Sequence, residues 1–274
     1  MKQLANYLVF GNVLIALGAA SLFWLTCALN NFAIEFDFAV FFVFSATLVT
    51  YILQRYLQLD NAKAKGFTER TTWISHNIQP VIFIGGVALV AAFFSFVLSG
   101  IKFYWWMFLP ALAIIIYPLP ILLGKKPKDF IVIKSIIIAA IWAFATVTIP
   151  FLLYELHPLE NEMLYQFGER LIFILLLKLP FDLKTANHKT TSNINLSAII
   201  SGVALAMFYA MAYFFNHQSA LSISQIVLPL FCILALTIFL LFKNNLLQKD
   251  WNRDLYLNCL LIVHFLIVFA IMQF

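Results

Sequence analysis

Nine long apolar runs, separated by short polar connections, constrain this chain more than any other feature. A helix needs about 20 apolar residues to cross a bilayer core of about 30 Å. The expected spans cover approximately residues 4–29, 34–57, 78–99, 103–123, 130–154, 163–181, 195–215, 221–242 and 255–273. Backbone polar groups in lipid must be satisfied within their own segment, so these runs predict helices rather than strands. The sequence therefore predicts an all-α integral membrane protein with a single nine-helix domain, residues 1–274.

The composition agrees with this prediction. Of the 274 residues, 64% are hydrophobic and only 11% are charged, whereas about 25% of the residues in a soluble domain are charged. The first apolar run is longer than the segment of about 7–15 residues in a cleaved signal peptide. We therefore expect this run to remain as the first membrane span.

The basic residues predict an orientation. With a cytoplasmic N-terminus, all but two of the 17 Lys and Arg residues lie at cytoplasmic ends, and the exceptions are Lys102 and Arg170. The 12 carboxylates divide equally between the two sides, so the bias is specific to positive charge, as the positive-inside rule requires. The sequence predicts a multi-pass protein of the cell inner (cytoplasmic) membrane. Its formal charge of +5 indicates contact with membrane lipids, and we expect no nucleic acid partner.

Motifs of soluble enzymes are not found in the sequence, which has no GxxxxGK[ST], HExxH or GxSxG pattern. Cys27, Cys232 and Cys259 lie in expected spans without CxxC spacing, which favours packing roles over a disulfide or a zinc site. Asn12 and His264 are polar groups within spans. We expect each of them to make a hydrogen bond between helices.

Polar side chains gather near the expected cytoplasmic ends of three spans. The second span ends in TYILQRYLQLD, where the spacing of Tyr51, Gln54 and Arg55 places them on one helix face. Lys134 opens the fifth span, and the sixth ends in KLPFDLK with Asp182 directly behind a Pro-Phe pair. Because cations exceed carboxylates here, the pattern predicts a cytosol-facing cavity for an anionic headgroup.

A purely structural interpretation of the same residues stays open. An arginine at a span end, such as Arg55, commonly extends its guanidinium to the lipid headgroups. Lys134 is equally an anchor under the positive-inside rule. Asp182 follows Lys178 by four residues, a spacing that favours an ion pair at the end of a helix.

The segment KSIIIAAIWAFATVTIP, residues 134–150, followed by LPFDLK, residues 179–184, resembles the fifth and sixth helices of the UbiA-type membrane prenyltransferases. Members of that family open the fifth helix with a lysine and carry an aspartate motif after the sixth. Nine helices with a cytoplasmic N-terminus are also the family's arrangement. The resemblance implies a UbiA-like bundle around a central cavity that opens laterally to lipid.

The resemblance also implies a chemistry. In the family, two aspartate motifs hold Mg²⁺ against the diphosphate of a prenyl donor, and the prenyl group passes to a lipophilic acceptor. Asp182 would then be the catalytic and metal-binding residue of this chain. The implied substrate-binding residues are Tyr51, Gln54, Arg55, Lys134 and Lys184.

The chain departs from both family motifs. The first motif, NDxxDxxxD, is replaced by YILQRYLQLD, which leaves only Asp60 near its end. The second, DxxDxxxD, reads DLKTANHK, with Thr185 and Lys189 at the other two aspartate positions. The carboxylates expected on the same membrane face, as candidate replacements, are Asp60, Glu69, Asp250 and Asp254.

Three functions follow as alternatives. The first is a UbiA-like intramembrane prenyltransferase that uses Mg²⁺. The second is a non-catalytic relative that binds an isoprenoid or an anionic lipid on the same scaffold. The third is a transporter of small solutes, which the lack of an evident internal repeat disfavours.

Overall fold

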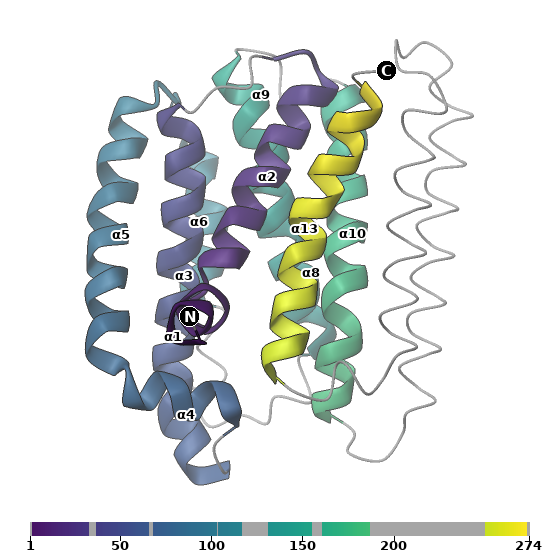
Figure 1. Ribbon diagram of the computed structural model, residues 1–274. Coiled ribbons are helices and arrows are strands. Elements are labelled where there is room, and N and C mark those ends of the chain that lie inside the picture. Colours follow the sequence, from purple (N-terminus) through teal and green to yellow (C-terminus); the bar gives the residue numbers. More distant parts are fainter. Residues whose placement is uncertain are drawn as a thin grey trace.

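The computed structural model describes residues 2–32, 37–65, 68–102, 104–116, 131–154, 161–186 and 250–272. Every regular element in these ranges is a helix, and the long helices run side by side as a bundle (Figure 1). Four of them are long and apolar enough to cross a membrane, or five if one bent pair forms a single span. The described part of the chain is therefore all-helical, with helices that suit a membrane protein. The expected spans at 195–215 and 221–242 lie outside the described residues.

The first expected span, 4–29, is divided into two helices, which differs from the prediction of one uninterrupted span. Helix α1, Lys2–Phe10, and helix α2, Val13–Leu29, meet at a bend of 54°. Asn12 adopts left-handed backbone angles there, with φ 65° and ψ 15°, a conformation that asparagine tolerates better than most residues. A Cβ atom on Gly11 would collide with the carbonyl oxygen of Tyr7. The Gly-Asn pair thus explains the break.

The next helices follow the apolar pattern closely. Helix α3, Phe38–Lys65, contains a membrane-length apolar part, and helix α5 covers Ile78–Leu98. The polar connection between them contains a further short helix, α4, Glu69–His76. A capping box starts this helix, because the Thr68 and Thr71 side chains each accept a hydrogen bond from the other residue's backbone N–H. Helix α4 lies at one end of the bundle, below α3 and α5 (Figure 1).

The fourth expected span begins with the short helices η1, Trp105–Met107, and α6, Phe108–Ile116, and its remainder lies outside the described residues. The fifth is continuous from α8, Ile131–Ala143, through the π-helical turn η3, Phe144–Thr148, to α9, Ile149–Leu153. Helix α10 covers Asn161–Ala186, and α13 covers Asp250–Met272.

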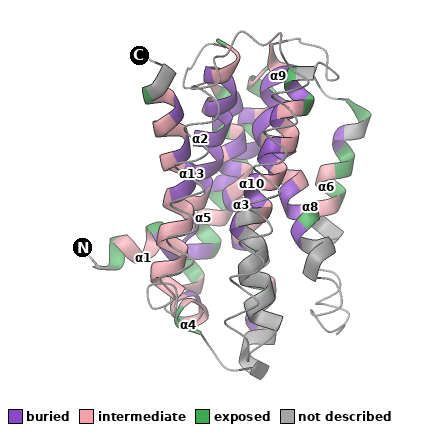
Figure 2. Cartoon of the chain, turned by 90° about the vertical axis from the view of Figure 1, so that its right-hand side faces the viewer, coloured by how far each residue is buried: buried purple, intermediate pink, exposed green. Residues whose placement is uncertain are grey.

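Helix α2 forms the centre of the described bundle and packs against α3, α13 and η3. Figure 2 shows its largely buried surface, whereas α6 presents many exposed residues at the edge. Close packing with α13 depends on Gly18, because a Cβ atom there would lie 2.6 Å from Cδ1 of Leu261. Small residues at such contacts allow helices to approach closely in membranes.

Candidate functional site

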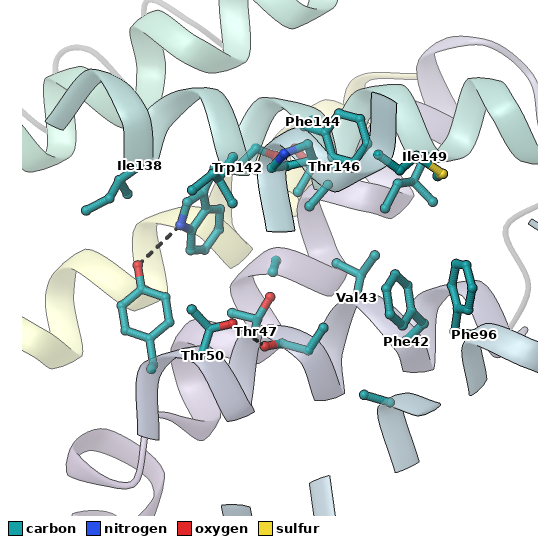
Figure 3. A pocket seen from close by; sticks show the side chains of 18 of the residues that line it. Phe42, Val43, Thr47, Thr50, Phe96, Ile138, Trp142, Phe144, Thr146 and Ile149 are labelled. Carbon is teal, nitrogen blue, oxygen red and sulfur yellow. Dashed lines mark hydrogen bonds between the residues drawn. The ribbon is translucent and has the colours of Figure 1, made fainter. Parts of the chain in front are cut away.

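A cavity of about 450 Å³ lies between α3, α5, α6, α8 and η3. Its walls are largely apolar, and the Phe and Trp side chains in them are Phe42, Phe93, Phe96, Trp142 and Phe144. The polar side chains in the walls are those of Thr47, Thr50, Tyr51, Gln54 and Thr146. Among the described residues, no Asp, Glu, Lys, Arg or His side chain lines this cavity. Figure 3 shows how the labelled side chains surround it.

The spacing of residues on α3 builds one wall. Val43, Thr47, Thr50 and Gln54 recur every three or four residues, so they lie on one helix face. Opposite this face, Trp142 of α8 donates a hydrogen bond from Nε1 to the Tyr51 hydroxyl oxygen, 3.2 Å away (Figure 3). This bond joins the two helices beside the polar residues of α3.

The π-helical turn η3 shapes the second wall, and the sequence explains why this turn forms. Pro150 has no N–H, so it cannot donate to the Thr146 carbonyl four residues earlier. The Thr26 hydroxyl of α2 donates to this carbonyl instead, at 2.7 Å, while Ile149 N–H bonds to Phe144 O, five residues back. A hydroxyl from a neighbouring helix thus satisfies a backbone group that proline leaves without a donor.

Arg55 does not line the cavity, although Tyr51 and Gln54 do. It lies instead near a charged cluster where α3, α4 and α13 meet. Arg70 of α4 forms an ion pair with Asp254 of α13, and Arg253 pairs with Asp250 at 2.7 Å. Burial, followed by the nearby Arg55 cation, lowers the pKa of Arg70 to about 10. Arg70 therefore remains charged at neutral pH.

The remaining expected site residues lie at helix ends. Lys134 is in the first turn of α8, and Asp182 and Lys184 are in the last turns of α10. Their side chains lie outside the described ones, so the Mg²⁺ site at Asp182 stays a prediction. Within the described ranges, no three His, Cys, Asp or Glu side chains are grouped to hold a metal ion. Two proposed replacements for the missing motif aspartates, Asp250 and Asp254, are paired with arginines.

The sequence interpretation missed a second polar cluster inside the bundle. Arg170, expected on the outer side, has 0% exposure, and its Nε lies 3.7 Å from Oε2 of Glu169. His264 of α13 places Nε2 4.0 Å from Oε1 of Glu169, and its ring contacts Phe173 edge-on. Contrary to expectation, neither His264 Nδ1 nor the Arg170 guanidinium makes a hydrogen bond to any described residue. Two features of the sequence could have indicated this cluster. They are the adjacent Glu and Arg residues within an apolar helix, and the histidine within a membrane span.

Comparison with models of known protein families, with curated proteins and with solved structures gives no significant match for this chain. The resemblance to the UbiA-type enzymes therefore stays an expectation from the sequence.

Proposed function

We propose that this chain binds the hydrocarbon part of a lipid in the cavity between α3, α5, α6 and α8. The supporting observation is the cavity itself, whose 450 Å³ is within the range of about 300–1,000 Å³ typical of small-molecule sites. Its aromatic walls suit an isoprenoid chain, because polarizable rings pack well against unsaturated branched hydrocarbon. The nine-span topology with a cytoplasmic N-terminus is part of the same proposal.

The cavity walls favour a particular kind of polar group on the ligand. Hydroxyl and amide groups line the cavity at Thr47 and Gln54, and these groups donate or accept hydrogen bonds without charge. Burying an ionised group without a counter-charge is costly. A neutral hydroxyl or carbonyl group on the lipid is therefore the better match for this part of the site.

The catalytic form of the proposal is a divergent UbiA-like prenyltransferase. Asp182 would hold Mg²⁺ against the diphosphate of a prenyl donor, with Lys134 and Lys184 neutralising the leaving group. The neutral lipophilic acceptor would occupy the cavity beside Tyr51 and Gln54. Metal and lysine charges placed where negative charge develops are the expected source of acceleration.

A non-catalytic lipid-binding protein is the second candidate, and the pairing of Asp250 and Asp254 with arginines favours it. Carboxylates in such ion pairs are poor replacements for metal ligands, because binding a metal would leave the arginine charges without partners. This candidate keeps the cavity and its hydrogen-bonding wall, but it dispenses with Mg²⁺.

The two candidates are separated by measuring binding and turnover of geranylgeranyl diphosphate by the detergent-purified chain, with and without Mg²⁺. Mg²⁺-dependent binding with pyrophosphate release, abolished by Asp182→Asn, would establish prenyl transfer. Binding that is indifferent to metal and to Asp182→Asn, without release, would establish the non-catalytic protein. Failure to bind either this diphosphate or neutral geranylgeraniol would reject both.

A further inference from the structure

Three arginines and two aspartates meet at the end of the bundle where α3, α4 and α13 come together. Asp254 is shared, because it pairs with Arg70 and also lies 3.7 Å from Nε of Arg253. Asp250 is bound by Arg253 at 2.7 Å. Arg70 and Arg253 thus make the ion pairs of both carboxylates. Among the side chains that the structure describes, no carboxylate forms an ion pair with Arg55.

The guanidinium groups of this cluster have unused hydrogen-bonding capacity. Nε of Arg55 and Nε of Arg70 are both buried, and neither donates to any group in the described ranges. A buried donor without an acceptor is costly, and so is an excess positive charge held inside the protein. Burial is the main cause of the lowered pKa of Arg70, and the nearby Arg55 cation lowers it further. An anion bound between the two arginines would relieve both costs.

The position of the cluster restricts where such an anion comes from. The apolar part of α3 ends at Leu57, two residues after Arg55, and the apolar span of α13 begins at Asp250. The cluster therefore lies at the level of the lipid headgroups. None of its five residues lines the cavity, so an anion here is not the polar group of the cavity ligand.

We propose that Arg55 and Arg70 bind a phosphate group at the membrane surface, supplied by an anionic lipid headgroup or by a free phosphate ion. Guanidinium groups suit this ligand, because their planar set of N–H donors matches phosphate oxygens in two-pronged hydrogen bonds. Basic pockets between helices near the headgroups are typical sites for anionic lipids. This site is independent of the cavity and stands even if the cavity binds nothing.

The test is thermal unfolding of the full chain in detergent at constant ionic strength. One arm adds inorganic phosphate in place of chloride, and the other adds micelles containing phosphatidylglycerol or phosphatidylcholine. A ligand at 100 times its dissociation constant should raise Tm by about 5–10 °C. A shift with phosphatidylglycerol alone identifies a lipid headgroup as the source, and a shift with inorganic phosphate alone identifies the free ion. A shift with both shows that the phosphate group itself is recognised.

Arg55→Gln is the decisive variant, because it removes a cation that forms no ion pair with any carboxylate side chain described in the structure. It should abolish the ligand-induced shift while leaving the Tm without ligand unchanged or raised. Arg55→Lys, which keeps the charge without the two-pronged donor set, should retain only part of the shift. Lys102→Gln, four residues beyond the C-terminal end of α5, is the matched control and should retain the whole shift.

Two results would overturn the proposal. One is a wild-type Tm that neither phosphate nor phosphatidylglycerol raises above the chloride and phosphatidylcholine controls. The other is an Arg55→Gln variant that keeps the full shift, or that unfolds at a lower temperature without ligand. The latter would show that Arg55 has a structural partner.

Discussion

Thr26 illustrates how one side chain supports the wall of the cavity. Its hydroxyl donates to the Thr146 carbonyl, which Pro150 leaves without a helical donor, and it is completely buried. The Thr146 hydroxyl in turn donates to Trp142 O at 2.8 Å. The position of Trp142, and of its hydrogen bond to Tyr51, thus depends on a contact between α2 and the π-helical turn.

Thr26→Val should destabilise the protein by about 1–3 kcal/mol, because it leaves the buried Thr146 carbonyl without a donor. The size and shape of the side chain are nearly unchanged, so packing contributes little. Reversible unfolding in mixed micelles measures the difference. Thr26→Ser keeps the hydroxyl and is the control. Equal stability of Thr26→Val and the wild type would show that the hydroxyl bond is not needed.

Glu169 and Arg170 should behave as a coupled pair. Glu169→Gln alone is expected to cost about 3–5 kcal/mol, because it leaves the fully buried Arg170 charge without its neighbouring carboxylate. The double variant Glu169→Gln with Arg170→Met removes both charges and should recover most of this loss. A double-mutant cycle of unfolding free energies measures the coupling. Additive effects would mean that the two charges do not interact.

At the scale of helices, the apolar pattern predicted most of the described elements. The expected span 78–99 corresponds to α5 at Ile78–Leu98, and 130–154 corresponds to the continuous segment from α8 to α9. Length and hydropathy determine such spans directly. The break at Asn12 and the π-helical turn before Pro150 were not predicted, because both depend on local backbone chemistry that hydropathy does not report. Helix α4 was missed for a similar reason, since it starts with a capping box and packs against α1, α3, α5 and α13.

The contact between α2 and α13 should be sensitive to the size of residue 18. Gly18→Ala places a Cβ atom 2.6 Å from Cδ1 and 2.8 Å from Cβ of Leu261, and overpacking of this kind costs about 1–3 kcal/mol. Leu261→Ala in the same chain removes the contact with Cδ1 but keeps the Cβ atom, so it should relieve the clash only in part. Gly86→Ala on α5 is the matched control, because its Cβ atom would meet nothing within 4 Å. A Gly18→Ala variant as stable as Gly86→Ala would contradict this packing.

At the scale of the whole molecule, the apolar cavity lies apart from the charged cluster where α3, α4 and α13 meet. The sequence predicted that Tyr51, Gln54 and Arg55 act at one site, because their spacing places them near one another on a helix. Tyr51 and Gln54 line the cavity, whereas Arg55 lies near α4 and α13. Helical spacing identifies which residues are neighbours on a helix, but the elements that each of them meets depend on tertiary packing. His264 of α13 likewise comes within 4.0 Å of Glu169 of α10 only in the folded bundle.

The most direct test of the lipid-binding cavity is photolabelling with an isoprenoid that carries a diazirine in its chain, followed by peptide mapping of the adducts. The account predicts adducts on the cavity walls, around Thr47 of α3 and Trp142 of α8. It also predicts that Thr47→Trp, which fills the cavity, removes them, whereas Phe94→Trp, an exposed residue outside the cavity walls, does not. Labelling spread evenly over the exposed surface of α5, including Phe83, and unchanged by Thr47→Trp, would contradict the account.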